Sequence, residues 1–129
     1  MTIPEQDLHS FIRATFRSVW AIELLCHVRG HFRARPELPP VPMDEIVTAL
    51  RASRLVVERG LADLSAAGLT SVDEQGRVKY EPVSADLDAL AGAAEAFYGK
   101  SPDAVRRMII AAANPGIAAF ADAFKLRRD

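Results

Sequence analysis

Apolar residues recur at helical spacing through the first quarter of the chain, which predicts one long helix over residues 7–28. Asp7 or Ser10 can cap its start, and Gly30 is placed to end it. The second half is apolar almost all round, so we expect a central helix or a subunit contact. The apolar positions that carry this pattern are Phe11, Ile12, Phe16, Val19, Trp20, Ile22, Leu24, Leu25 and Val28.

The helical pattern stops near His31, and four prolines follow before residue 43. Proline fixes φ and has no N–H to donate, so this segment should be extended and stiff, with at most a brief edge strand around Val41. We interpret residues 31–42 as a rigid connector between two packed elements. A short proline-rich ligand for an aromatic groove is the alternative interpretation.

Two shorter helices are predicted next. Residues 43–51 carry apolar side chains at i, i+1 and i+4, with two carboxylates in the first turn where they favour the helix dipole. Ser53 is a good N-cap for a further helix, whose apolar positions are Val57, Leu61 and Leu64 and which should close at Gly68. A glycine is costly inside an exposed helix, so we expect Gly60 to mark the close approach of another helix.

A β-hairpin should follow this helix. Residues 69–72 and 78–80 are strand-like, and they flank the polar loop of residues 73–77 with a glycine near its end. An isolated two-stranded hairpin is marginal in water, so it must pack on the helices or gain a third strand. Val41 is the candidate for that third strand.

The last third of the chain is helical and rich in alanine. One helix should start at Ser84 or Asp86 and stop at Gly99, and a second should start at residues 101–103. Residues 114–116 interrupt the pattern before a third apolar set, which consists of Ile117, Phe120, Ala121 and Phe124. Small alanines let helices approach closely, so we expect a homodimer through the first and C-terminal helices. The alternative is that these helices cap the core of a monomer.

Size and charge narrow the class of protein. A chain of 129 residues fits one domain with its own core. No apolar stretch approaches the roughly 18 residues of a membrane span, and the acidic start lacks the layout of a secretory signal. We therefore expect a cytoplasmic protein without a membrane partner. The net charge of −1 means that any phosphate-binding surface must be a local patch.

The sequence offers little chemistry for catalysis or metal binding. Cys26 lies in a dense apolar stretch, which predicts a buried, inert thiol. His27 and His31 have the spacing of two ligands on one helix face, but Gly30 should break the helix between them. A ligand pocket between the first helix and the C-terminal helices, lined by Phe16, Trp20 and Phe97, is less expected than an ordinary core. No phosphate-cradling glycine loop or nucleophile with a base occurs, so we expect neither an enzyme nor a cofactor.

The stretch from Ser53 to Leu69, followed by a hairpin, resembles the helix-turn-helix and wing of bacterial winged-helix regulators, of which MarR-like proteins are the nearest comparison. The resemblance implies a winged helix-turn-helix, and the helical pattern of the last third adds further helices to it. We therefore expect a mainly α fold with a small β-hairpin wing, a winged helix-turn-helix with additional C-terminal helices. It places the winged-helix core at residues 11–82 and the added helices at residues 84–126 of a single domain over residues 1–129. The proline-rich connector and the helical last third depart from the family pattern.

The resemblance also implies DNA contacts. In such regulators the helix that begins near Ser53 enters the major groove of duplex DNA and the wing touches the backbone or minor groove. The residues placed there are Arg51, Ser53, Arg54, Leu55, Arg59, Arg77 and Lys79. Five cations and four carboxylates lie between Arg51 and Lys79, so this patch is only weakly basic. Two copies in a dimer would strengthen DNA binding.

Two functions follow from these expectations. The first is a sequence-specific, dimeric DNA-binding regulator that acts by occupying duplex DNA. The second is a winged-helix adaptor that binds a protein partner through the rather apolar outer face of the helix beginning near Ser53, without binding DNA.

Overall fold

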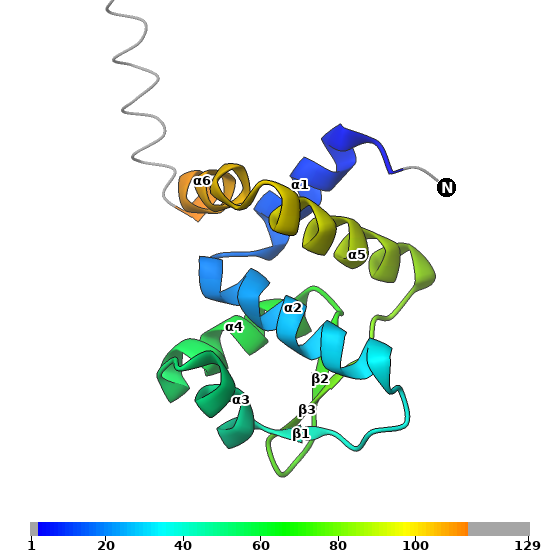
Figure 1. Ribbon diagram of the computed structural model, residues 1–129, viewed down its shortest axis with the longest axis vertical. Coiled ribbons are helices and arrows are strands. Elements are labelled where there is room, and N and C mark those ends of the chain that lie inside the picture. Colours follow the sequence, from blue (N-terminus) through cyan, green and yellow to red (C-terminus); the bar gives the residue numbers. More distant parts are fainter. Residues whose placement is uncertain (1–2, 114–129) are drawn as a thin grey trace, which may run out of the picture.

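The computed structural model describes residues 3–113, which form six helices and a small sheet (Figure 1). The fold is mainly α with one three-stranded antiparallel sheet. The helices are α1 (Glu5–Thr15), α2 (Val19–Ala34), α3 (Met43–Leu50), α4 (Arg54–Ala66), α5 (Ala85–Lys100) and α6 (Pro102–Ala113). The strands are β1 (Val41–Pro42), β2 (Thr70–Val72) and β3 (Arg77–Tyr80).

Helix α2 lies in the middle of the molecule (Figure 1). On one side it packs against α5 and α6, beside which α1 lies, and on the other side against α4 and β3. Its buried side chains, which include Ile22, Leu25 and Val28, are therefore covered from both directions. This confirms the expectation that the apolar second half of the first pattern is a central helix.

The prediction of one helix over residues 7–28 is wrong, because the structure has two helices there. Phe16 leaves the helical conformation with φ −100° and ψ 111°. Ser18 is extended, and its hydroxyl accepts a hydrogen bond from the N–H of Ala21 at 3.3 Å, which caps the start of α2. Phe16 is fully buried, so the break carries its ring into the core.

The predicted helix end at Gly30 is also wrong. Helix α2 continues through Gly30 to Ala34, and Gly30 is exposed. Apart from its chain neighbours and the backbone of its own helix, no atom lies within 4 Å of the position that a Cβ would occupy. His27 and His31 therefore do lie one turn apart on one helix. Within residues 3–113, no group of three His, Cys, Asp or Glu side chains is arranged to hold a metal ion.

The hairpin and the third strand are confirmed. Strand β3 lies between β1 and β2, and Val41 pairs with Val78 while Thr70 pairs with Tyr80. Gly76 has φ +76°, a conformation that favours glycine, in the loop between β2 and β3. The sheet therefore ties the end of the proline-rich connector to the hairpin.

The predicted limits of α4 are close to the observed ones. The Ser53 hydroxyl accepts a hydrogen bond from the N–H of Val56 at 3.2 Å, and Gly68 has φ +80° just after the helix. A Cβ on Gly60 would lie 3.1 Å from Cδ2 of Leu24, so the predicted close approach of another helix is confirmed and the partner is α2. Val57, Leu61 and Leu64 are buried as expected.

The C-terminal pair is helical as predicted. Ser84 caps α5, and α5 ends one residue beyond Gly99. Helix α6 packs against α1 and α5 within the same chain, with Val105 and Ile109 fully buried. The apolar set expected after residue 116 lies outside the described residues. None of the helices in residues 3–113 is long and apolar enough to cross a bilayer.

Candidate functional site

Helix α4 presents one face to solvent, and this face is the one expected from its periodicity. The exposed residues of α4 are Arg54, Leu55, Glu58, Arg59, Ala62, Ser65 and Ala66. Leu55 is unusual among them, because an apolar side chain of its size is 54% exposed near the start of the helix. The exposed surface of α4 therefore combines two cations, one carboxylate and a small apolar surface.

The turn before α4 is short and its backbone is well defined. Arg51 follows α3 in a left-handed conformation, with φ 53° and ψ 38°, and its N–H bonds to the carbonyl of Thr48 at 3.3 Å. A non-glycine residue rarely adopts this conformation, so Arg51 shapes the turn through its backbone while its side chain stays exposed. Ser53 then caps α4. Ser53, Arg54 and Leu55, at the start of this helix, are exposed to solvent.

Arg54, which we expected to contact DNA, is held by two carboxylates. It forms ion pairs with Asp44 at the start of α3 and with Glu58 one turn along α4, the latter at 3.2 Å. All three side chains are exposed, so these pairs add little to stability. They do balance the charge of Arg54, and a phosphate would have to compete with both carboxylates for it.

Arg77 at the start of β3 is balanced in the same way. Its Nε lies 2.7 Å from a carboxylate oxygen of Asp73 in the hairpin loop. The backbone N–H of Arg77 also donates to Asp73 at 2.8 Å, and this bond, with the guanidinium pairing, lowers the pKa of the Asp73 carboxyl. The hairpin loop is thereby closed on itself, and its arginine contributes less net positive charge than the sequence suggests.

The remaining predicted cations are not balanced in this way. Within the described residues, no carboxylate lies within 4 Å of the charged groups of Arg51, Arg59 or Lys79. Arg51 lies in the α3–α4 turn, Arg59 on the outer face of α4 and Lys79 on β3. Within residues 3–113, these three residues, unlike Arg54 and Arg77, are the cations of the predicted set that have no carboxylate partner.

The predicted site residues come from neighbouring elements. Helix α3 packs on α4, and α4 packs on β2, so the turn, the outer face of α4 and the hairpin belong to one end of the molecule. Figure 1 shows α3, α4 and the hairpin together at the end opposite α1, α5 and α6. The elements that carry Arg51, Leu55, Arg59 and Lys79 therefore lie near one another in the fold.

Sequence reasoning missed a second group of residues beside α4. Arg17 and Trp20, from the α1–α2 turn and the start of α2, line a hollow together with Arg59. Trp20 is 40% exposed, although its helical spacing had placed it in the core. The aromatic residues considered for a pocket, Phe16, Trp20 and Phe97, line three different hollows, and Phe97 stacks on His9 with ring centroids 5.5 Å apart.

Cys26 is half-buried rather than buried, and its environment opposes ionisation. Burial and the nearby carboxylates of Glu95 and Glu23 raise the pKa of the thiol to about 12. Because the thiolate is the reactive form, Cys26 does not provide a nucleophile near neutral pH. This agrees with the inert thiol expected from the sequence.

Comparisons of the chain with protein-family models, with curated proteins and with solved structures found no match.

Proposed function

We propose that the protein is a DNA-binding transcriptional regulator with a winged helix-turn-helix, similar to MarR-like regulators, in which α4 enters the major groove. The order α2, β1, α3, α4, β2, β3 supports this, as does a sheet in which the hairpin strand β3 pairs with β1. The hairpin of β2 and β3 is the wing in this proposal. Its action is to occupy duplex DNA rather than to catalyse a reaction.

One observation carries the proposal: α4 is capped by Ser53, packed on its inner face and exposed along its outer face. The first residues of a recognition helix reach base edges, and the helix N-terminus favours a phosphate. Arg59 is the candidate for guanine and Leu55 for a thymine methyl group. Arg51 and Lys79 are the candidates for phosphate contacts on either side.

The charge available for DNA is small in one copy of the chain. Three cations without a carboxylate partner would give a slope of about −3 in the logarithm of affinity against the logarithm of salt concentration. We propose a homodimer, because two copies would double this number. A dimeric reader would place its two α4 helices about 34 Å apart, which is one turn of duplex DNA.

Charge reversal at the unpaired cations tests the proposal. Binding to random duplexes is measured by gel shift at several salt concentrations. In the variant Arg59→Glu/Lys79→Glu we expect weaker binding and a salt slope reduced by about two per copy. The matched control is Arg13→Glu/Arg107→Glu, which makes the same change of net charge on α1 and α6. It should retain the affinity when analytical ultracentrifugation shows the same oligomeric state as the unmodified protein.

The outcome also separates the regulator from the adaptor. If the unmodified protein shows no salt-sensitive binding to duplex DNA at micromolar concentrations, the regulator is excluded. The adaptor would then be favoured by the exposed Leu55 and the alanines of the outer face of α4, an apolar surface that fits a protein partner. Equal loss of affinity in both double variants would instead refute the assignment of α4 as the recognition helix.

A further inference from the structure

Three shallow hollows follow one another along one side of the molecule. The first lies between α1 and α6 and is lined by Arg13, Arg107 and Met108. The second shares Arg13 and Ala112 with the first and adds Arg17. The third shares Arg17 with the second and reaches Trp20 and Arg59 on α4. Because each hollow shares residues with the next, they form one surface, which we call the arginine trough.

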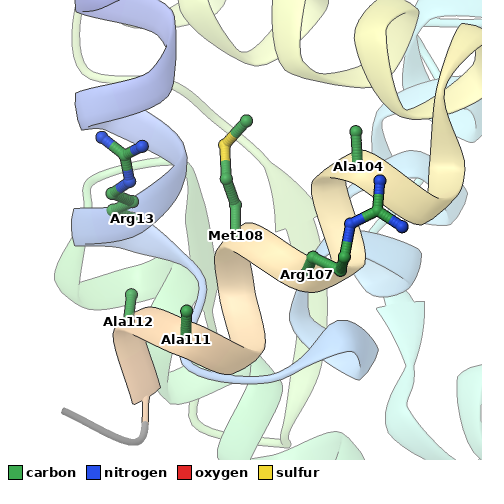
Figure 2. A pocket seen from close by; sticks show the side chains of 6 residues that line it. All are labelled: Arg13, Ala104, Arg107, Met108, Ala111 and Ala112. Atoms are coloured by element: carbon green, nitrogen blue, oxygen red, sulfur yellow. The ribbon is translucent and has the colours of Figure 1, made fainter. Parts of the chain in front are cut away.

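The arginine trough is apolar between its charges. Figure 2 shows Met108 between Arg13 on α1 and Arg107 on α6, with Ala111 and Ala112 beside it. At the other end, Trp20, Val56 and Ala62 line the hollow together with Arg17 and Arg59. The lining of the trough therefore combines four arginines with apolar side chains.

The four arginines of the trough have no carboxylate partner in the part of the chain that the structure describes. Within residues 3–113, no ion pair involves Arg13, Arg17, Arg59 or Arg107, whereas the adjacent Arg106 pairs with Asp103 at 3.2 Å. One carboxylate, that of Asp63, lines the three hollows. A protein with a net charge of −1 thus gathers four unpaired guanidinium groups on one side, where their field attracts an anionic partner.

We propose that the arginine trough binds an acidic, amphipathic helical segment of a partner protein. Guanidinium groups bind carboxylates through two parallel hydrogen bonds, and the apolar floor can bury one face of a helix. A DNA backbone would match the charges but would leave Trp20 and Met108 without apolar partners. The segment after Ala113 is a poorer match, because residues 114–129 contain three basic and two acidic residues.

This inference does not depend on DNA binding by α4, although the two surfaces meet at Arg59. Arg13 and Arg107 lie at the far end of the trough, on α1 and α6. Reversal of these two charges should therefore affect the partner segment and leave binding of duplex DNA unchanged. The same double variant is the control for the proposed DNA interface, so failure of one proposal can be told from failure of the other.

Trp20 provides a direct reporter, because it is the single tryptophan of the chain and lies in the trough. The probe is a synthetic helix-forming peptide of about 16 residues, with leucine at every third or fourth position, four glutamates flanking the leucine face and alanine elsewhere. Titration of the full chain should shift the Trp20 emission to shorter wavelength. Raising the salt from about 0.05 to 0.5 M should weaken binding at least tenfold, since it shortens the Debye length. A peptide with lysine in place of glutamate should not bind.

Variants locate the binding surface. We expect Arg13→Glu/Arg107→Glu to weaken binding of the acidic peptide by about tenfold or more, because two attractive contacts become repulsive. Arg33→Glu/Lys100→Glu, which reverses two exposed charges elsewhere, should change it by less than about threefold. Far-ultraviolet circular dichroism and thermal unfolding check that all variants fold.

Three results would overturn the proposal. One is the absence of any Trp20 response or binding of the acidic peptide at millimolar concentration. Another is an equal loss of peptide binding in Arg13→Glu/Arg107→Glu and Arg33→Glu/Lys100→Glu. That result would show that the net charge of the protein, and not the trough, determines the affinity for the peptide. The third is a trough variant that loses affinity for duplex DNA but keeps its affinity for the peptide, which would assign the surface to nucleic acid.

Discussion

Arg29 on α2 is a charged residue in the interior, with a side chain that is 7% exposed. Its Nη1 donates to Glu95 of α5 at 3.1 Å, its Nε lies 3.7 Å from Asp88, and its guanidinium lies 6.0 Å from the ring centre of Tyr80 on β3. Burial alone would lower the pKa of Arg29, but the hydrogen bonds with Glu95 and Tyr80 outweigh it and raise the pKa. The residue thus stays charged and joins three elements.

Gly92 makes room for this guanidinium, and its substitution gives a prediction at the residue scale. A Cβ at Gly92 would lie 2.7 Å from Nη2 of Arg29, so alanine must displace a buried charge from its partner. We expect Gly92→Ala to lower the free energy of unfolding by about 1 kcal/mol, because the lost interaction (about 1–3 kcal/mol) exceeds the helix propensity gained (about 0.5–1 kcal/mol). Urea denaturation measures the change.

Gly30→Ala is the matched control for this prediction. Gly30 is also inside a helix, but nothing lies within 4 Å of its added Cβ, so alanine should raise the free energy of unfolding by about 0.5–1 kcal/mol. In an Arg29→Met background the cost of Gly92→Ala should disappear, since the long guanidinium is gone. A similar stabilisation by alanine at both glycines would contradict this account of Gly92.

At the scale of elements, the end of α4 determines where the hairpin begins. The N–H of Leu69 bonds to the carbonyl of Leu64 at 2.9 Å, and the N–H of Gly68 bonds to that of Ser65 at 3.0 Å, a pair of bonds known as the Schellman motif. It requires a left-handed residue, which Gly68 supplies with φ +80°. Leu64 and Leu69 are both fully buried, so the motif also closes the core beneath the turn.

Two glycines with nearly equal φ allow the backbone and packing contributions at this helix end to be separated. Gly76→Ala, at φ +76° with open space around the added Cβ, should cost only the left-handed strain of about 1–2 kcal/mol in unfolding free energy. Gly68→Ala should cost more, because its Cβ would also lie 3.0 Å from a methyl group of Val83. Thermal denaturation compares the two variants. If Gly76→Ala destabilised the protein more than Gly68→Ala, the contact with Val83 would not add to the cost of alanine at position 68.

The elements with a local signal were predictable. Ser53 and Gly68 bracket α4, and a polar loop separates the hairpin strands, because caps and turns depend on residues adjacent in sequence. The division between α1 and α2 was not predictable from spacing, since apolar residues continue on both sides of Ser18. The predicted helix end at Gly30 was wrong because a glycine ends a helix when its backbone adopts a left-handed conformation. Gly30 does not have a positive φ, and α2 continues through it.

The outer face of α4 was predicted correctly, since the burial of one face fixes the other. The charge on that face was not, because Arg54 pairs with Asp44 across the α3–α4 turn, ten residues away. The arginine trough was not predictable either, since it joins α1, α4 and α6 only when the chain is folded. The sequence pattern was therefore enough to predict which face of α4 is exposed. The charge of that face could not be predicted, because it depends on contacts that form only in the tertiary structure.

At the scale of the whole molecule, α2 connects the two ends of the fold. It packs on α4 and β3 at one end and on α5 and α6 at the other, and Arg29 reinforces the second contact. Because one helix supplies side chains to both halves of the core, neither half should unfold alone. We therefore expect a single cooperative unit over the described residues.

This cooperativity can be measured with a substitution far from its reporter. Ile109 on α6 is fully buried, and Ile109→Ala should lower the free energy of unfolding by about 2–5 kcal/mol. If the molecule is one unit, the urea midpoint seen by Trp20 fluorescence at the start of α2 should fall as far as the midpoint seen by circular dichroism. Arg107→Ala, on the exposed side of the same helix, should change either midpoint very little. A Trp20 transition that stays in place while the dichroism transition moves would show that α5 and α6 fold as a separate unit.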